Sequence, residues 1–219
     1  MTTFPGSPKL IKGGIVLLNP GTSAVLRIIA LQYNSDSMSR SFQIQSVGAG
    51  SGDRSEALRL KGPPVETIKL EAEVDAADQL EFPEQHATIV QSGLHAQLAA
   101  LETMIYPSSR QLQVNNILAN SGTLEIVPME TPLMLFVWSK NRIIPVRLTE
   151  FSITEEAFDP ALNPIRAKVS LGMRVLSIDD LGFSHKGGNL FMSFLQNKEQ
   201  LSARHQGGTF GNLGITGIS

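Results

Sequence analysis

The sequence predicts a mainly β protein with flanking helices. Residues 165–175 alternate between apolar and polar side chains, and a period of two is typical of a half-buried strand. Further runs rich in β-branched residues recur along the chain, separated by turn sequences such as Asn-Pro-Gly. Helical periodicity is strong in only two stretches, so we expect the helices to flank a β core.

A long hairpin over residues 142–176 is the element around which we expect the fold to be organised. Its strands are residues 143–153 and 165–175, and two X-Pro pairs punctuate the polar tip between them. Eleven residues at about 3.3 Å each span roughly 36 Å, well beyond the usual strand of about 5–6 residues. Because uncovered strand edges recruit other chains, we expect this ribbon to be shared between identical subunits, by closure of a barrel or a ring.

The strands before the hairpin are predicted from shorter runs. Residues 10–18 and 25–33 form a first hairpin that we expect to be largely buried, and residues 39–47 follow it. Residues 57–74 form a strand interrupted by a Gly-Pro-Pro sequence, which marks a bend or a sheet edge. The apolar face of this strand is expected to consist of Ile68, Leu70, Ala72 and Val74.

Two more strands are expected at residues 123–127 and 133–138. The second is almost continuously apolar, which indicates a strand buried on both sides. Residues 75–82 suggest a short helical turn, and residues 91–106 give the strongest helix, stopped by Pro107. The apolar stripe of this helix consists of Leu94, Leu98, Leu101 and Ile105.

The end of the chain differs in composition from the part before it. Acidic residues and glycines over residues 179–188 indicate a linker, a helix is expected over residues 190–204, and residues 207–219 form a glycine-rich, extended arm. We therefore divide the chain into a β domain, residues 1–180, and a C-terminal helix and arm, residues 181–219.

Composition excludes several classes of function. A formal charge of −2 argues against a general nucleic-acid binder, and the absence of cysteine excludes disulfides and thiolate metal sites. Residues 1–8 lack the apolar segment of a signal peptide, and no run reaches the roughly 18–20 apolar residues of a membrane span. We expect no direct membrane insertion, and a cytoplasmic location unless a larger machine exports the protein. Charged residues make up 17% of the chain against about 25% usually, which fits a surface covered by other subunits or an ordinary β-rich protein.

No catalytic, metal or cofactor site is predicted. His86 and His95 have Glu84 and Glu102 nearby, but their spacing matches no zinc pattern, so surface histidines are expected. The glycine-rich residues 48–53 lack the lysine of a phosphate-binding loop. No Gly-x-Ser-x-Gly nucleophile motif is present.

Charged residues of the hairpin are the candidate functional residues. The tip is acidic, and paired carboxylates could serve acid–base chemistry or calcium binding, but the glycine and closing glutamate of a calcium loop are missing. A solvated or subunit-bridging tip is the better interpretation. The basic side chains form either an ordinary solvated face, or a face that lines a channel or pairs with the acidic tip of the next subunit. The acidic candidates are Glu155, Glu156 and Asp159, and the basic ones are Arg147, Arg166, Lys168 and Arg174.

Six stretches occur in a familiar order along residues 8–180. The most specific are the QYN turn at residues 32–34, the KGPP segment at 61–64, and FSITEEAFDPALNPIR at 151–166. Together these stretches resemble the tube-like domain of contractile injection system adaptor proteins, which belong to phage-tail-like particles such as antifeeding prophages and Photorhabdus virulence cassettes. The six stretches are residues 8–20, 28–43, 58–81, 94–107, 133–177 and 179–182.

The resemblance implies a fold similar to the inner tube proteins of phage tails, a β-barrel with one outer helix. It implies a ring of six copies whose strands line a lumen, placed between the trimeric spike hub and the sixfold tube. Adaptors of this kind commonly carry a LysM-type module; here residues 181–219 offer only a helix and an arm. Barrel and lumen strands would come from residues 57–74, 133–138, 143–154 and 165–176, and the outer helix from residues 94–106.

The leading functional hypothesis is a non-enzymatic, ring-forming baseplate adaptor that nucleates tube assembly. Its expected partners are further copies of itself, the spike hub, and a tube initiator or inner tube protein, with baseplate wedge or sheath as further candidates. A tube initiator or inner tube subunit is the main alternative, and the residues beyond Leu176 favour the adaptor. A small β-barrel enzyme and a ligand-binding module are the remaining hypotheses.

Overall fold

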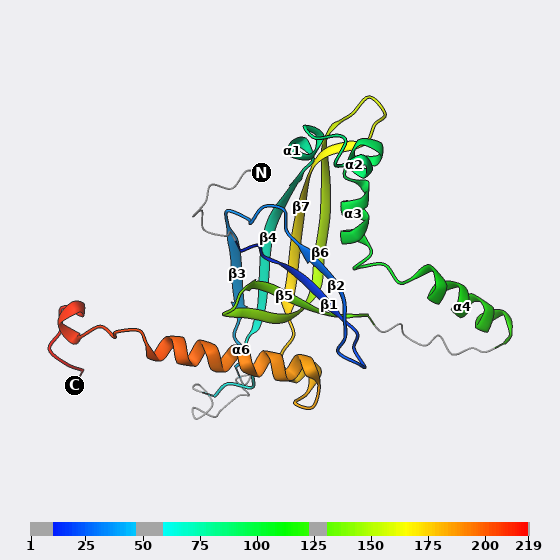
Figure 1. Ribbon diagram of the computed structural model, residues 1–219. Helices are drawn as coiled ribbons and strands as arrows, with labels where there is room; N and C mark the ends of the chain where they lie inside the picture. Colours follow the sequence, from blue (N-terminus) through cyan, green and yellow to red (C-terminus); the bar gives the residue numbers. More distant parts are fainter. Residues whose placement is uncertain (1–10, 47–58, 123–130, 219) are drawn as a thin grey trace.

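The computed structural model describes residues 11–46, 59–122 and 131–218. Within these ranges the protein is mainly β, with one antiparallel sheet of seven strands and flanking helices, so the predicted fold class is confirmed (Figure 1). The predictions for residues 1–8, 48–53 and 123–127 lie outside the described residues.

The sheet is a single curved layer with the long hairpin in its interior. Its strand order is β2-β1-β5-β6-β7-β4-β3, and every neighbouring pair is antiparallel. The two terminal strands, β2 and β3, are not paired with each other, so the sheet is open where a closed barrel was expected. The strands are β1 Gly14–Leu18, β2 Val25–Ala30, β3 Met38–Gln43, β4 Val65–Asp75, β5 Leu133–Ser139, β6 Arg142–Phe158 and β7 Pro164–Val175.

The core lies on one face of the central strands. Alternate residues of β4 and β7 are buried, as their period of two predicts, and they contact helices packed on that face. The strand β5 is buried on both sides over its first four residues, which confirms the prediction from its continuous apolar sequence. The buried side chains of β4 and β7 include Ile68, Leu70, Ala72, Val74, Ala167, Val169, Leu171, Met173 and Val175.

A β-bulge at Thr149 divides β6 into two halves. Leu148 lies opposite Met173, but Glu150 lies opposite Gly172, so Thr149 is an extra residue on this strand. The bulge moves the apolar face from even-numbered to odd-numbered residues, and both halves therefore present their apolar side chains to one core. Gly172 has no side chain, and a Cβ there would approach the Cβ of Glu150 to 2.9 Å.

The expected helix over residues 91–106 is instead two shorter helices. The break lies at Gly93, whose φ is +53°, a value that favours glycine. The hairpin tip causes it: a Cβ on Gly93 would meet the C=O of Pro164 at 2.5 Å, and the N–H of Leu94 donates to that same C=O at 2.9 Å. The outer helix expected from residues 94–106 corresponds to the shorter α3 His95–Glu102, and α2 Ala87–Ser92 precedes the break as a separate helix.

Two other helices lie before and after this pair in the chain. The short turn predicted over residues 75–82 is α1 Ala77–Leu80. The stretch 111–119, for which no structure was predicted, belongs to α4 Ser109–Asn120, which begins with a capping box at Ser108. No residue of α4 is buried, and the helix projects away from the body of the protein (Figure 1).

The first hairpin is only half buried. The strand β1 is buried on both faces between β2 and β5, as expected. Its partner β2 is the end strand of the sheet, and Val25, Leu26 and Ile28 are 53–67% exposed. The expectation of a largely buried hairpin is therefore wrong for β2, in which Ile29 packs against the core while these three side chains remain exposed.

The C-terminal helix is attached to the body at its start. After α5 Ile178–Leu181, the helix α6 Lys186–Ala203 buries Phe191 and Phe194 in the main core. The arm beyond it is not extended throughout as expected, since it contains the 3₁₀ helix η2 Phe210–Leu213. The division of the chain at residue 180 stays a prediction.

A buried carboxylate ties α6 to the sheet. Glu66 of β4 is 4% exposed and accepts bonds from the guanidinium of Arg40, at 2.6–2.7 Å, and from Nζ of Lys198 on α6, at 3.3 Å. The Lys198 ammonium also lies 4.3 Å from the ring centre of Phe194. Burial and the positive charge of Arg40 lower the pKa of Arg142 at this site, while Glu66 opposes that shift.

Replacing Glu66 by alanine is expected to reduce the free energy of unfolding by roughly 2–3 kcal/mol, because two partly buried cations lose their counter-charge. Chemical denaturation followed by circular dichroism measures this change. The control is Glu71→Ala on the same strand, where the side chain is exposed and the expected change is within about 0.5 kcal/mol. Equal effects of the two substitutions would contradict the role of the buried cluster.

Candidate interaction surface

Strands β6, β7 and β4 present a continuous polar face on the side opposite the core, which we call the charged face. Residues paired across antiparallel strands share a face, so the registers define its rows. Read from β6 through β7 to β4, the rows are Arg147–Arg174–Thr67, Glu150–Gly172–Lys69, Ser152–Ser170–Glu71, Thr154–Lys168–Glu73 and Glu156–Arg166–Asp75.

Ion pairs cross this face from strand to strand. Nε of Arg166 lies 2.7 Å from the carboxylate of Asp75 and 3.6 Å from that of Glu73. Nζ of Lys69 lies 2.7 Å from Glu150, directly over the glycine of β7. Because most of these side chains are well exposed, each pair contributes at most about 1 kcal/mol, and their main effect is to hold the polar side chains in register.

The charges of this face balance. Its rows contain five basic and five acidic side chains, interleaved, with hydroxyl groups between them and no large apolar side chain. Such a surface has neither the single-sign field that concentrates a charged ligand nor an apolar patch that binds other proteins. The geometry is suited to a surface that remains hydrated. The basic residues are Lys69, Arg147, Arg166, Lys168 and Arg174, and the acidic ones are Glu71, Glu73, Asp75, Glu150 and Glu156.

The structure brings together five of the seven predicted site residues. The other two lie elsewhere: Glu155 pairs in register with Ala167 and so belongs to the opposite face, and Asp159 lies in the tip turn. The acidic tip therefore does not act as one cluster. Within the subunit, Lys168 already binds the acidic tip at Glu156, at 3.2 Å. A lumen or subunit-interface role for these residues stays a prediction. The five on the charged face are Arg147, Glu156, Arg166, Lys168 and Arg174.

Asp159 has a local structural role. Its carboxylate accepts bonds from the N–H of Ala161, the N–H of Asn163 and the side-chain amide of Asn163, each at 2.8 Å. These bonds, with that from the Asn163 side chain the strongest, lower the pKa of Asp159 below its ordinary value. The carboxylate thus shapes the turn that enters β7.

The acidic partners on β4 and at Glu150 were missed from the sequence. Residues of β4 were assigned to faces correctly, but which strand lies beside them is a tertiary property. The shift of apolar residues from Leu148 to Phe151 was a visible signal for a bulge, and it would have placed Glu150 on the charged face.

The outer half of β6 has a free margin, by which we mean the side of residues 147–158 that faces away from β7. The neighbouring strand β5 pairs only with the first five residues of β6, up to Val146. In the described ranges, no other strand pairs with this margin. By contrast, β7 is paired along most of its length with both β6 and β4.

Hydrogen-bond direction shows which groups face the free margin. The N–H of Leu176 donates to the C=O of Pro145, so even-numbered residues of β7 direct their backbone groups toward β6. Their register partners on β6 include Ser152 and Thr154. The alternate residues Ile153 and Glu155 therefore direct their N–H and C=O groups to the free margin.

Two negative findings concern the described residues only. They contain no group of three His, Asp or Glu side chains that could hold a metal ion, and His86 and His95 belong to no such group. Among the helices placed in residues 11–46, 59–122 and 131–218, none is long and apolar enough to cross a membrane.

Comparison of the sequence with protein families and with curated proteins gave no match. Comparison with solved structures gave a chain in the tail of an empty GTA particle with C6 symmetry, at 13% identity and a TM-score of 0.28, covering 75% of this chain and 90% of that one. A second is a chain in the virion of a native gene transfer agent particle, at 12% identity and a TM-score of 0.26, covering 74% and 90%. Both superpositions are too loose to bear on fold or function.

The ion pair between Asp75 and Arg166 is expected to make stability depend on acidic pH. Burial acts to raise the pKa of Asp75, but the bond from the Ala77 N–H and the pairing with Arg166 outweigh it and leave the pKa lowered. A lowered carboxyl pKa stabilises the fold above the unfolded value of about 3.9, and this contribution is lost as pH falls through the folded value.

Asp75→Asn is therefore expected to cost about 0.5–1 kcal/mol near neutral pH, and less as pH falls below about 4. Denaturant unfolding of both proteins across this pH range provides the measurement. The matched variant Glu71→Gln lies on the same strand and face and, in the described structure, joins no ion pair. A constant difference at all pH values would refute this assignment.

Proposed function

We propose that this protein is a non-enzymatic, ring-forming adaptor in the baseplate of a contractile injection system. The observation that carries the proposal is the free margin of β6, which leaves an ordered strand in the middle of the sheet with one neighbour instead of two. An unpaired margin of this kind is a template for pairing with a strand of another chain. The resemblance along residues 8–180 to tube-like adaptor proteins gives that other chain an identity, a further copy of this one.

The charged face supports a lumen role in such a ring. Strands that continue from copy to copy would place the charged face of each β6–β7–β4 unit on the same side of a closed sheet. Balanced charge and the lack of apolar side chains would let cargo pass without being retained. The core face, covered by α2, α3 and α6, would then form the outer layer of the ring.

The ring would join the trimeric spike hub on one side to the sixfold inner tube on the other, and so nucleate tube growth. Symmetry matching and edge pairing, rather than bond chemistry, would be its mechanism. Assembly would occur in the cytoplasm before the ring becomes part of the particle. Contacts with baseplate wedge or sheath would fall to the outer layer or to the C-terminal segment.

A tube initiator or inner tube subunit is the second candidate. The segment after β7, from α5 to η2, favours the adaptor, since it adds a helix and an arm beyond the strands that a tube requires. Electron microscopy of the purified particle, with symmetry determined layer by layer, separates the two. One sixfold ring supports the adaptor, many stacked rings support the tube subunit, and a protein that is monomeric in the particle excludes both.

A proline in the free margin is expected to prevent ring formation. Glu155 has an exposed side chain and directs its N–H to this margin, so Glu155→Pro removes a donor from the intersubunit ladder and leaves the β6–β7 bonds in place. Glu155→Ala removes only the carboxylate and is expected to assemble normally.

Light scattering of the two variants and of the unchanged protein gives the oligomeric state, and circular dichroism verifies folding. Folded Glu155→Pro protein that assembles as the unchanged protein does would exclude pairing at this margin. Loss of assembly in both variants would instead show that the Glu155 carboxylate, and not its backbone N–H, is needed for assembly.

A further inference from the structure

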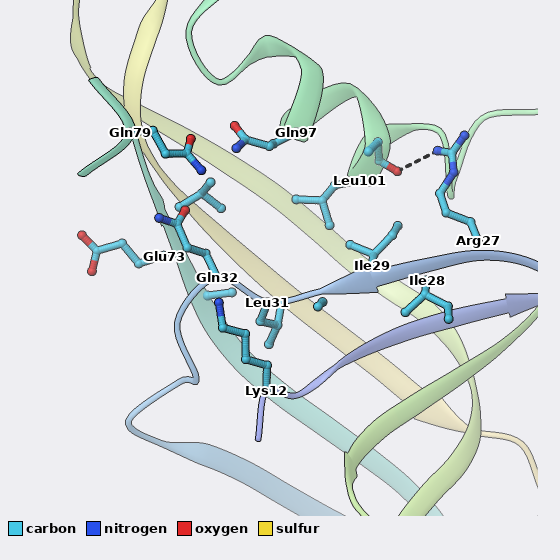
Figure 2. A pocket seen from close by; sticks show the side chains of 14 residues that line it. Lys12, Arg27, Ile28, Ile29, Leu31, Gln32, Glu73, Gln79, Gln97 and Leu101 are labelled. Atoms are coloured by element: carbon cyan, nitrogen blue, oxygen red, sulfur yellow. Dashed lines mark hydrogen bonds between the residues drawn. The ribbon is translucent and has the colours of Figure 1, made fainter. Parts of the chain in front are cut away.

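A cleft of about 350 Å³ lies along the unpaired edge of β2. It is lined by the consecutive residues 27–30 of β2 and by the two residues that follow this strand, together with Ala72 and Val74 of β4 and Leu101 of α3 (Figure 2). Consecutive residues of a strand point to opposite faces, so a cleft lined by all of them follows the edge of the strand. That edge has no partner strand within the described residues.

Both ends of the cleft are fixed by hydrogen bonds. At one end, Arg27 donates to the hydroxyl of Thr103 at 2.7 Å and to the C=O of Ala100 at 3.3 Å. At the other, the carboxamide of Gln32 exchanges two bonds with the backbone of Asp75, at 2.6 and 3.0 Å. These bonds join the segment 27–32 to α3 at one end of the cleft and to the end of β4 at the other.

The interior of the cleft has unmet hydrogen-bonding capacity. Gln79 and Gln97 point toward each other beneath α3 (Figure 2), and the Oε1 atom of each is buried and accepts no hydrogen bond from the described residues. A buried acceptor without a donor is energetically unfavourable, so an occupant that donates to it is stabilised there. Part of the adjoining wall is apolar, formed by Ile29 and Leu31, and the charged residues Lys12 and Glu73 line the cleft as well. An occupant must thus supply both N–H donors and small apolar side chains, which is the chemistry of an extended peptide.

The C-terminal arm of the chain has this chemistry. Residues 206–218 contain no charged side chain and five glycines, so their backbone can approach a strand edge closely. Leu213 is 73% exposed and Ile215 is 43% exposed, and in an extended conformation the two would share one face, as Ile29 and Leu31 do. The short helix η2 buries no residue, so no packing opposes its extension.

The arm does not lie near the cleft of its own chain. The helix α6 has 18 residues, about 27 Å in length, and carries the arm away from α1 and α3 (Figure 1). A donor segment on one side of the subunit and an acceptor edge on another form a head-to-tail contact, the kind that generates a ring. We propose that the C-terminal arm of one copy adds as a strand to the edge of β2 in a second copy and fills this cleft.

This inference rests on the proposed function in supposing that copies of the chain meet, and it names a second contact between them. The protein contains no cysteine, so single cysteines can be placed without background. Two full-length variants, Ile28→Cys in the acceptor edge and Ile215→Cys in the arm, would be mixed and oxidised. Cα atoms of paired strands lie about 4.5–5.5 Å apart, within the range that disulfides bridge. The control replaces Ile28→Cys by Leu112→Cys, another exposed apolar position, which lies on α4.

The expected result is at least about tenfold more heterotypic disulfide with Ile28→Cys than with Leu112→Cys, because docking raises the local concentration of the arm to the millimolar range. Light scattering of the same mixtures gives the oligomeric state. A ring that forms without the specific disulfide overturns the arm inference and leaves the proposed function intact. A chain that remains monomeric and unlinked overturns both, whereas specific linkage in a dimer supports the arm inference and contradicts the ring.

Discussion

The structure depends on a mismatch in strand length. β6 has seventeen residues and β5 has only seven, so the pairing between these strands begins at Arg142 and ends at Val146. The remaining strand stays ordered because β7 supports it on one side and the core supports its apolar face through Leu148, Phe151 and Ile153. An ordered, singly paired strand of this kind is an aggregation hazard in an isolated protein and an interface in an assembled one.

The central strands have an apolar face that packs in the core and a charged face on the other side, and small local features keep the two faces separate. The bulge at Thr149 moves the apolar side chains of β6 from even-numbered to odd-numbered residues, and Gly172 leaves space for Glu150 to reach Lys69. On the core side, Glu66 connects the sheet to α6. The sheet can therefore present a fully polar surface without losing contact with the helices behind it.

Most basic residues of the charged face, but not most of their acidic partners, were predicted from the sequence. The basic residues of β7 stood out because they alternate regularly with apolar ones. Their acidic partners Glu73 and Asp75 lie some ninety residues earlier, and nothing in the local sequence says that β4 pairs with β7. Asp159 shows the opposite error, since proximity in sequence to Glu155 and Glu156 suggested a cluster that the turn geometry separates.

The sequence by itself determined the class of fold, the positions of the long hairpin and the core residues of β4 and β7. It could do so because strand periodicity and turn chemistry are local properties of the chain. Only the tertiary structure decided the strand order, the break at Gly93, the exposure of β2 and the buried setting of Glu66. Each of these depends on which distant segment of the chain packs beside the residue or strand in question. The apolar pattern of a strand indicates that one face is buried, but it does not indicate which segment buries it.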